Sequence, residues 1–176
     1  MSPISYQGPM AADERPKRTH SQSAELNFGI GQPGLTVDSI LSDKGGDIHT
    51  ATPHITTKEV IAELARLRIG ALVVVDSANA PIGIITERDI VRSAEANGPE
   101  MFETLVETIM TADPKTCHPE DKIETVMKQM TEGGFRHMPV TDAGKLVGLI
   151  SIRDVVRHRM LEIEYENLKM KQAIVG

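Results

Sequence analysis

The stretch that decides the fold is "GIITERDI" at residues 83–90, which returns as "GLISIRDV" at residues 148–155. Both copies contain a glycine, two apolar residues, a hydroxyl residue, a variable residue, an arginine, an aspartate and a β-branched residue. The copies are 65 residues apart (148 − 83). Such a phrase, written twice, predicts an internal duplication.

Three further pairs of segments extend the duplication. They are "VDSIL" (37–41) with "VETIM" (106–110), "TPHITTKEVIAEL" (52–64) with "HPEDKIETVMKQM" (118–130), and "ALVVVD" (71–76) with "HMPVTD" (137–142). The offset falls from 69 (106 − 37) to 66 (118 − 52), and each change lies in an expected loop. We therefore predict one unit over 36–98 and a second over 104–160, preceded by a flexible tail (1–35) and followed by a C-terminal helix extension (161–176).

Apolar periodicity predicts the same β-α-β-β-α order in each repeat. The first helix of each repeat carries an apolar face, made of Val60, Ile61, Leu64 and Leu67 in one copy and Val126, Met127 and Met130 in the other. Strands are expected at 71–75, 82–86, 138–140 and 146–151, with second helices at 87–96 and 152–161. One such unit leaves a sheet face bare, so two α/β units that cover each other are expected.

Composition excludes several classes of protein. The net charge of −6 and the aromatic content of 3% argue against nucleic-acid binding. A single cysteine, Cys117, rules out an internal disulfide and indicates a reducing compartment. No apolar run approaches the roughly 20 residues of a membrane span, and no secretory signal is apparent. We expect a soluble, cytoplasmic protein.

The repeated phrase places a hydroxyl residue where a strand meets a helix, and this position has two interpretations. Thr86 and Ser151 can simply cap the helices, with the aspartate three residues later interacting with the helix dipole. Alternatively, the helix N-terminus and the hydroxyl bind an anion, helped by Arg88 and Arg153.

The aspartates favour a particular anionic ligand. Asp89 and Asp154 would repel a phosphate but suit the hydroxyls of a ribose. Hydroxyl and arginine for phosphate, with aspartate for sugar, together describe a nucleotide. The glycines that begin the phrase, Gly83 and Gly148, would let another surface approach the strand closely.

The repeats resemble the CBS domain, in tandem as a Bateman module, over about residues 37–160. The motifs that carry the resemblance are "IGALVVVD" (69–76), "GIITERDIVR" (83–92), "GGFRHMPVTD" (133–142) and "GLISIRDVV" (148–156). The chain particularly resembles stand-alone bacterial proteins that consist of little more than one CBS pair. The resemblance implies a pseudo-two-fold pair with two clefts for adenosine ligands such as AMP, ADP, ATP, NAD or S-adenosylmethionine.

The resemblance also implies roles for individual residues. Thr86 and Ser151 would contact phosphate, and Asp89 and Asp154 the ribose. Basic residues at Arg136 and His137 would bind phosphate, whereas the aligned Gly70 and Ala71 make the two sites unequal. The adenine edge would be read near Thr50 and Thr52 in the first repeat and near Thr116 and His118 in the second.

We expect a non-catalytic regulatory protein that senses energy or redox state. Cys117 and His118 lack the spacing of a metal site, and Cys117 lacks the partners of a catalytic nucleophile. Neither a metal site nor a catalytic cysteine is expected. An adaptor that works through a regulated partner protein, with ligand secondary, is the alternative. A small enzyme acting on the nucleotide is a third possibility.

The C-terminal helix carries its own pattern. Apolar residues recur at Val156, Met160, Ile163, Met170 and Ile174, with Asn167 in the gap and Leu161 and Leu168 beside them. An asparagine at such a position sets register and strand number in coiled coils. The resemblance to CBS modules, which commonly pair, favours self-association as a homodimer. The alternative is a helix that packs this stripe on its own module.

Overall fold

The computed structural model describes residues 35–45 and 48–175. The predicted tail over 1–35 lies outside these residues except for Leu35. The Leu35 amide donates to Glu162 Oε1 at 3.3 Å, and its carbonyl accepts from the Ile123 amide at 3.0 Å. No helix in the described part of the chain combines the length and the apolar character needed to cross a membrane.

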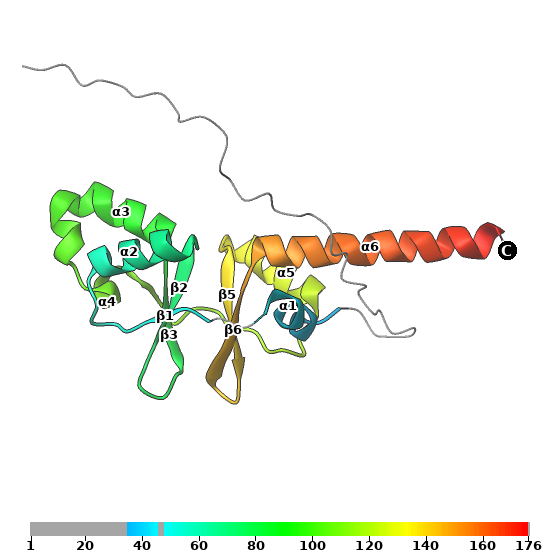
Figure 1. Cartoon of the computed structure of the whole chain (residues 1–176), viewed down its shortest axis with the longest axis horizontal. Helices are drawn as coiled ribbons and strands as arrows, with labels where there is room; N and C mark the ends of the chain where they lie inside the picture. The colour runs from blue at the N-terminus through cyan, green and yellow to red at the C-terminus, as the bar shows by residue number, and fades with distance from the viewer. Residues whose placement is uncertain (1–34, 46–47, 176) are drawn as a thin grey trace, which may run out of the picture. The chain divides into compact units, whose positions relative to one another are not determined.

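The first unit has the predicted β-α-β-β-α order (Figure 1). It contains β1 (Thr50–Ala51), α2 (Thr57–Leu67), β2 (Ala71–Val75), β3 (Pro81–Thr86) and α3 (Glu87–Asn97), followed by the short 3₁₀ helix η1 (Gly98–Glu103). Strand β1 runs parallel to β2, while β2, β3 and β4 (Thr111–Ala112) pair antiparallel. Helix α2 begins where Thr56 and Glu59 form a capping box.

The second unit repeats the α-β-β-α part of this order, but its sheet has two strands where the sheet of the first unit has four. Helix α5 (Ile123–Gly133) is followed by β5 (His137–Asp142), β6 (Lys145–Ser151) and α6 (Ile152–Val175). Cys117 forms a parallel bridge with Val140, as Ala51 does with Val74 in the first unit. The chain is thus an α/β protein of two equivalent units.

The strand register confirms the alignment of the repeats. Ala71 lies opposite Thr86, and His137 lies opposite Ser151. Each hairpin also shifts register at the same place, after Val74 in one unit and after Val140 in the other. The equivalence of the two units therefore holds residue by residue across both hairpins.

The units exchange their first helices. Helix α1 (Val37–Lys44) precedes the first unit in sequence, but Val37 and Ile40 belong to the core of the second. Helix α4 (Val106–Ile109) precedes the second unit, but Val106 belongs to the core of the first. Figure 1 shows α1 beside α5 and α6, and α4 on the side of α2 and α3. The linear boundaries 36–98 and 104–160 stay a prediction. Each packed core includes a helix from the other sequence range.

The glycine of each repeated phrase makes this exchange possible. A Cβ on Gly148 would lie 2.5 Å from Leu41 Cδ2, and a Cβ on Gly83 would overlap Met110 Sδ. Leu41 belongs to α1, and Met110 directly follows α4. The prediction that these glycines admit another surface is therefore confirmed, and that surface is the exchanged helix.

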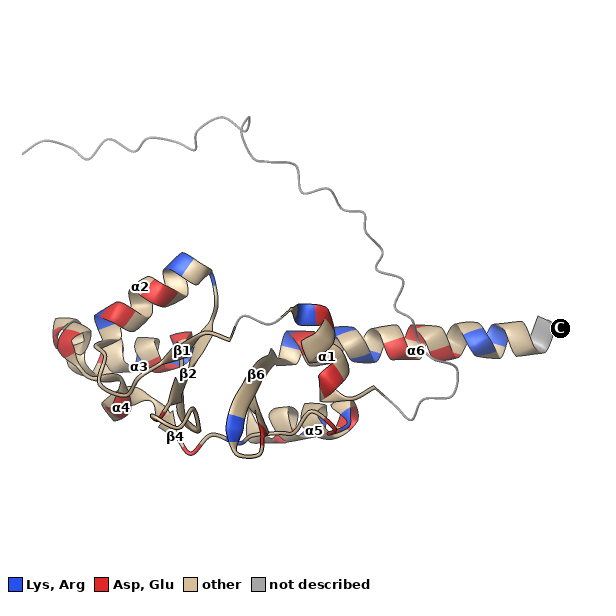
Figure 2. Cartoon of the chain, turned by 60° about the horizontal axis from the view of Figure 1, so that its bottom comes forward, with Lys and Arg blue, Asp and Glu red and all other residues tan. Residues whose placement is uncertain are grey.

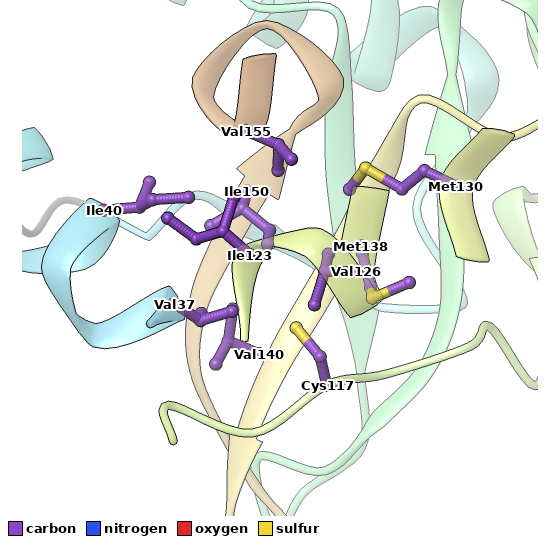
Figure 3. Close-up of a cluster of buried hydrophobic side chains, with 10 residues drawn as sticks. All are labelled: Val37, Ile40, Cys117, Ile123, Val126, Met130, Met138, Val140, Ile150 and Val155. Atoms are coloured by element: carbon purple, nitrogen blue, oxygen red, sulfur yellow. The ribbon is translucent and has the colours of Figure 1, made fainter. Parts of the chain in front are cut away.

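The second core is shown in Figure 3. Its side chains come from α1, α5, β5, β6, α6 and the segment before α5, and all are almost fully buried: Val37, Ile40, Cys117, Ile123, Val126, Met130, Met138, Val140, Ile150 and Val155. Each large apolar side chain here stabilises the fold by roughly 1.5–3 kcal/mol relative to an exposed position. Burial also raises the pKa of the Cys117 thiol to about 12, helped by the carboxylate of Asp121.

Candidate functional site

The first strand–helix corner is a capping box that uses one oxygen of Asp89. Thr86 Oγ1 and the Thr86 amide donate to Asp89 Oδ2 at 2.6 and 2.9 Å, and the Asp89 amide donates to Thr86 Oγ1 at 3.4 Å. Oδ1 makes no hydrogen bond with a described residue. The capping interpretation is therefore correct, and it leaves Oδ1 available to a ligand.

The second corner has the same geometry. Ser151 Oγ and the Ser151 amide donate to Asp154 Oδ2 at 2.7 and 2.8 Å, and the Asp154 amide donates to Ser151 Oγ at 3.3 Å. Here a cation is also present, because Lys44 Nζ donates to the same Oδ2 at 3.2 Å and to the Leu149 carbonyl at 3.0 Å. Lys44 comes from the last turn of the exchanged helix α1.

The hydrogen bonds at the second corner determine the charge of Asp154. Burial acts to raise the pKa of Asp154, but the bonds from Ser151 and the Lys44 ammonium outweigh it, so the pKa is lowered. The carboxylate of Asp154 is therefore ionised and already paired with a cation. The second corner differs in this respect from the first.

A cavity of about 410 Å³ lies at the first corner, between the two units. Its walls come from β3, the start of α3, and Thr111 of β4 on one side, and from the end of α5 through the start of β5 on the other. Arg88 Nη1 joins the two walls by donating to the Gly134 carbonyl at 3.4 Å. The volume is that of a small-molecule site.

The cavity brings together six of the predicted residues: Gly70, Thr86, Arg88, Asp89, Arg136 and His137. Its lining also includes residues that the sequence analysis missed, among them Glu87, Arg92, Thr111 and Phe135. Arg92 follows Arg88 by four residues and so shares its helix face, which was a usable signal. Thr111 could be found only by knowing that α4 packs on the other repeat.

The charged groups of the lining favour an anion. Three arginines (Arg88, Arg92 and Arg136) face two acids (Glu87 and Asp89). Burial lowers the pKa of His137, as does the charge of Lys44, while Asp154 and Glu87 act in the opposite direction. The histidine is therefore neutral near pH 7, and guanidinium groups dominate the cavity.

A second cavity of about 330 Å³ adjoins the first and shares Asp89, Arg92 and Thr111 with it. Its other walls are Ser93, Asn97 and Ile109. The Asn97 side-chain amide donates to Ser93 Oγ at 3.3 Å. The candidate site is therefore longer than the first cavity and has Asp89 near its middle.

The remaining predicted residues lie outside the lining of the first cavity. Ser151, Arg153 and Asp154 belong to the second corner. Ala71 is buried in β2, and Thr50, Thr52 and Thr116 are exposed. His118 Nδ1 lies 2.9 Å from the Thr141 carbonyl, so it makes a local contact near β5.

The described residues contain no group of three or more His, Cys, Asp or Glu side chains that could hold a metal ion. The lining of the first cavity presents arginine, hydroxyl and carboxylate groups.

Comparison with known proteins identifies both repeats. The family model of the CBS domain matches residues 37–96 and 106–161. An uncharacterized 17.7 kDa protein of Acidianus ambivalens is 38% identical over 111 residues, covering 62% of this chain and 66% of that protein, slightly less than two thirds of its length.

Solved structures show the same arrangement. A CBS-domain containing protein from Agrobacterium tumefaciens superposes with a TM-score of 0.68 at 37% identity, covering 71% of this chain and 99% of that one. The CBS domain pair of protein MJ0100, in complex with 5′-methylthioadenosine and S-adenosylmethionine, superposes with a TM-score of 0.63 at 28% identity, covering 71% and 95%.

Proposed function

This chain belongs to the CBS-domain family, with two domains in tandem, and from that premise we propose that it is a sensor of adenosine nucleotides. CBS domains are generally regulatory and non-catalytic. We assign the ligand to the cavity at the first corner. The observation that carries this assignment is the convergence of Thr86, Asp89 and three arginines on one cavity of about 410 Å³.

The proposed binding mode uses groups that the fold has already oriented. The guanidinium groups of Arg88 and Arg136 approach from opposite units and would bind phosphate oxygens. Asp89 Oδ1, which capping leaves unused, would accept hydrogen bonds from the ribose hydroxyls. A bound phosphate would thus hold the two units together, which is the differential contact that a sensor needs.

The charges of the cavity discriminate among the adenosine ligands. The CBS pair of protein MJ0100 binds 5′-methylthioadenosine and S-adenosylmethionine. In this chain three arginines line the cavity, and they favour a phosphate over the positive sulfonium of S-adenosylmethionine. We therefore propose AMP, ADP, ATP or NAD ahead of S-adenosylmethionine, so that the ligand reports energy or redox state.

We propose that the Asp154 corner does not bind a nucleotide while Lys44 occupies it. The Lys44 ammonium lies on the oxygen that caps α6 and also on the Leu149 carbonyl. In the first unit, the place equivalent to Lys44 is the segment that follows α4. This segment forms β4, which pairs with Gly83 and Ile84. The chain would therefore bind one nucleotide.

Thermal unfolding with and without ligand tests this function. AMP, ADP, ATP, NAD and S-adenosylmethionine are each added at millimolar concentration. A ligand present at 100 times its dissociation constant stabilises the fold by about 2.7 kcal/mol, which raises the midpoint of a domain this size by roughly 5–10 °C. No shift with any of the five would reject the proposal.

Two alanine variants localise the site. Asp89→Ala and Asp154→Ala remove equivalent capping carboxylates, so each lowers stability by about 1 kcal/mol. Only Asp89→Ala should abolish the ligand-induced shift. Ligand recovered chemically unchanged from the same samples would exclude nucleotide turnover.

An adaptor function remains the second candidate because exposed apolar side chains occur on α6. A flat response to every ligand, together with a stable interaction with another protein, would favour it. A cytoplasmic location and pairing of two chains are also proposals, and the pairing has its own structural basis in α6.

A further inference from the structure

Helix α6 continues well beyond the module on which its first turns pack. Its buried residues, Val155 and His158, lie near its beginning. Figure 1 shows the rest of the helix, drawn in orange to red, extending past α1 and α5. Large apolar side chains along α6 are substantially exposed: Val156 (40%) between the buried residues, and Met160 (58%), Ile163 (42%), Leu168 (57%) and Met170 (57%) beyond them.

Four of these side chains form one continuous stripe with Asn167. The positions 156, 160, 163, 167 and 170 are separated by alternating steps of four and three. This is the spacing of the a and d positions of a heptad. The stripe lies roughly a quarter-turn around the helix from Val155. It therefore does not face the core of its own module.

Figure 2 shows both acidic and basic residues along α6. The charges beside the stripe specify the direction of a partner helix. With Met160 and Asn167 at a, the e positions are Arg157, Glu164 and Lys171, and the g positions include Arg159 and Glu166. In a parallel pair, each g residue faces the next e residue of the other helix. That pairing sets Glu166 against Lys171, which have opposite charge. Arg159 would face Glu164, but Arg159 already forms ion pairs with Glu124 of α5 and with Glu162 in its own chain, so the Glu166–Lys171 pair carries the argument.

An antiparallel pair of the same helices would be less favourable. When it is centred on the stripe, Glu164 meets its own copy and Arg157 meets Lys171, so like charges face each other. Its a positions would also face d positions, which are all apolar here. The Asn167 amide would then be buried against an apolar side chain without a partner, which is unfavourable.

We propose that two copies of this chain associate through α6 as a parallel, in-register two-stranded coiled coil. Asn167 of one copy hydrogen-bonds Asn167 of the other and fixes the register. The described stripe covers little more than two heptads, so the association is reversible and depends on protein concentration. The interface does not rest on the nucleotide proposal, because its residues lie outside both cavities.

Disulfide cross-linking of the full-length chain tests the orientation. Cys117 is 1% exposed, so a cysteine introduced on α6 is the reactive one. Met160→Cys and Asn167→Cys should each cross-link to the same residue of a second copy under diamide, because both are a positions. Gln172→Cys lies on the outer face of the helix and should remain monomeric on a denaturing gel.

Other cross-linking results would overturn the proposal. An antiparallel pair would permit self-cross-linking at one of the two a positions at most. A chain that stays monomeric at high concentration, with neither position cross-linking, would mean that the stripe is covered by another segment or by a different protein.

Charge reversal provides an independent test by analytical ultracentrifugation. Glu166→Lys and Lys171→Glu should each weaken the dimer roughly 3- to 30-fold, because an attractive pair becomes a repulsive one at two places. The double variant restores opposite charges and should recover most of the affinity. Additive losses in the double variant would contradict the parallel arrangement.

Discussion

Replacing Gly148 by alanine tests whether the repeated phrase carries its glycine to admit the exchanged helix. The added Cβ would lie 2.5, 3.2 and 3.4 Å from Leu41 Cδ2, Cδ1 and Cγ. Carbon atoms in contact are normally about 3.5–4.0 Å apart, so the Leu41 side chain, or α1 or β6 with it, must move by about 1 Å. Such overpacking costs about 1–3 kcal/mol. With a denaturant slope of about 2 kcal/mol/M, the urea midpoint should fall by about 0.5–1.5 M.

A double-mutant cycle with Leu41→Ala separates the overlap from other effects of the substitution. Leu41→Ala removes the atoms that the new Cβ meets, so Gly148→Ala should then cost less than about 0.5 kcal/mol, because alanine is favoured over glycine in a strand. Gly83→Ala should cost less than Gly148→Ala, because its Cβ meets the flexible end of Met110. An unchanged penalty for Gly148→Ala in the Leu41→Ala background would refute the reasoning.

Three further predictions concern Lys44 and the buried titratable groups. Lys44→Met should expose Asp154 and raise the AMP stoichiometry from one to two per chain in calorimetry; a ratio that stays at one would mean that Lys44 is not what closes the corner. Cys117, with its pKa raised to about 12, should react with a thiol reagent only as fast as the chain unfolds, and faster labelling would contradict its burial. Burial lowers the pKa of both His137 and His158 below the ordinary 6.5, so the unfolded chain binds protons more readily, and stability should fall as the pH drops from about 7.5 to 5.5. This loss should be smaller in His137→Gln, and stability that rises on acidification would contradict the assignment.

The repeat pattern predicted the fold because apolar periodicity and a duplicated motif can both be recognised in the sequence itself. Both β-hairpins, their flanking helices and the two strand–helix corners were readable in this way. The first helices could not be assigned to a unit from the sequence. "VDSIL" and "VETIM" match each other, but neither segment indicates on which unit its helix packs. Their exchange depends on contacts such as Val37 with the core around Ile123, some 86 residues away (123 − 37).

The same limitation applies to the candidate site. Thr86, Asp89 and Arg136 could be predicted because the repeated motif and the alignment point to them, and all three line the same cavity. The occupation of the second corner by Lys44 was not predicted, because it depends on α1 continuing to Lys44 where α4 ends at Ile109. Thr50, Thr52, Thr116 and His118 were placed by loose local alignment, and the structure leaves them outside the cavity lining.

The exchanged helices also constrain how the chain acquires its structure during synthesis. Residues 37–44 leave the ribosome early, but the surface on which they pack includes Val155, which is made more than a hundred residues later. At about 5–20 residues per second, α1 must wait roughly 5–20 seconds without its partner. We therefore expect neither half of the gene, expressed alone, to yield a stable product, whereas the two halves expressed together should reconstitute the fold by complementation.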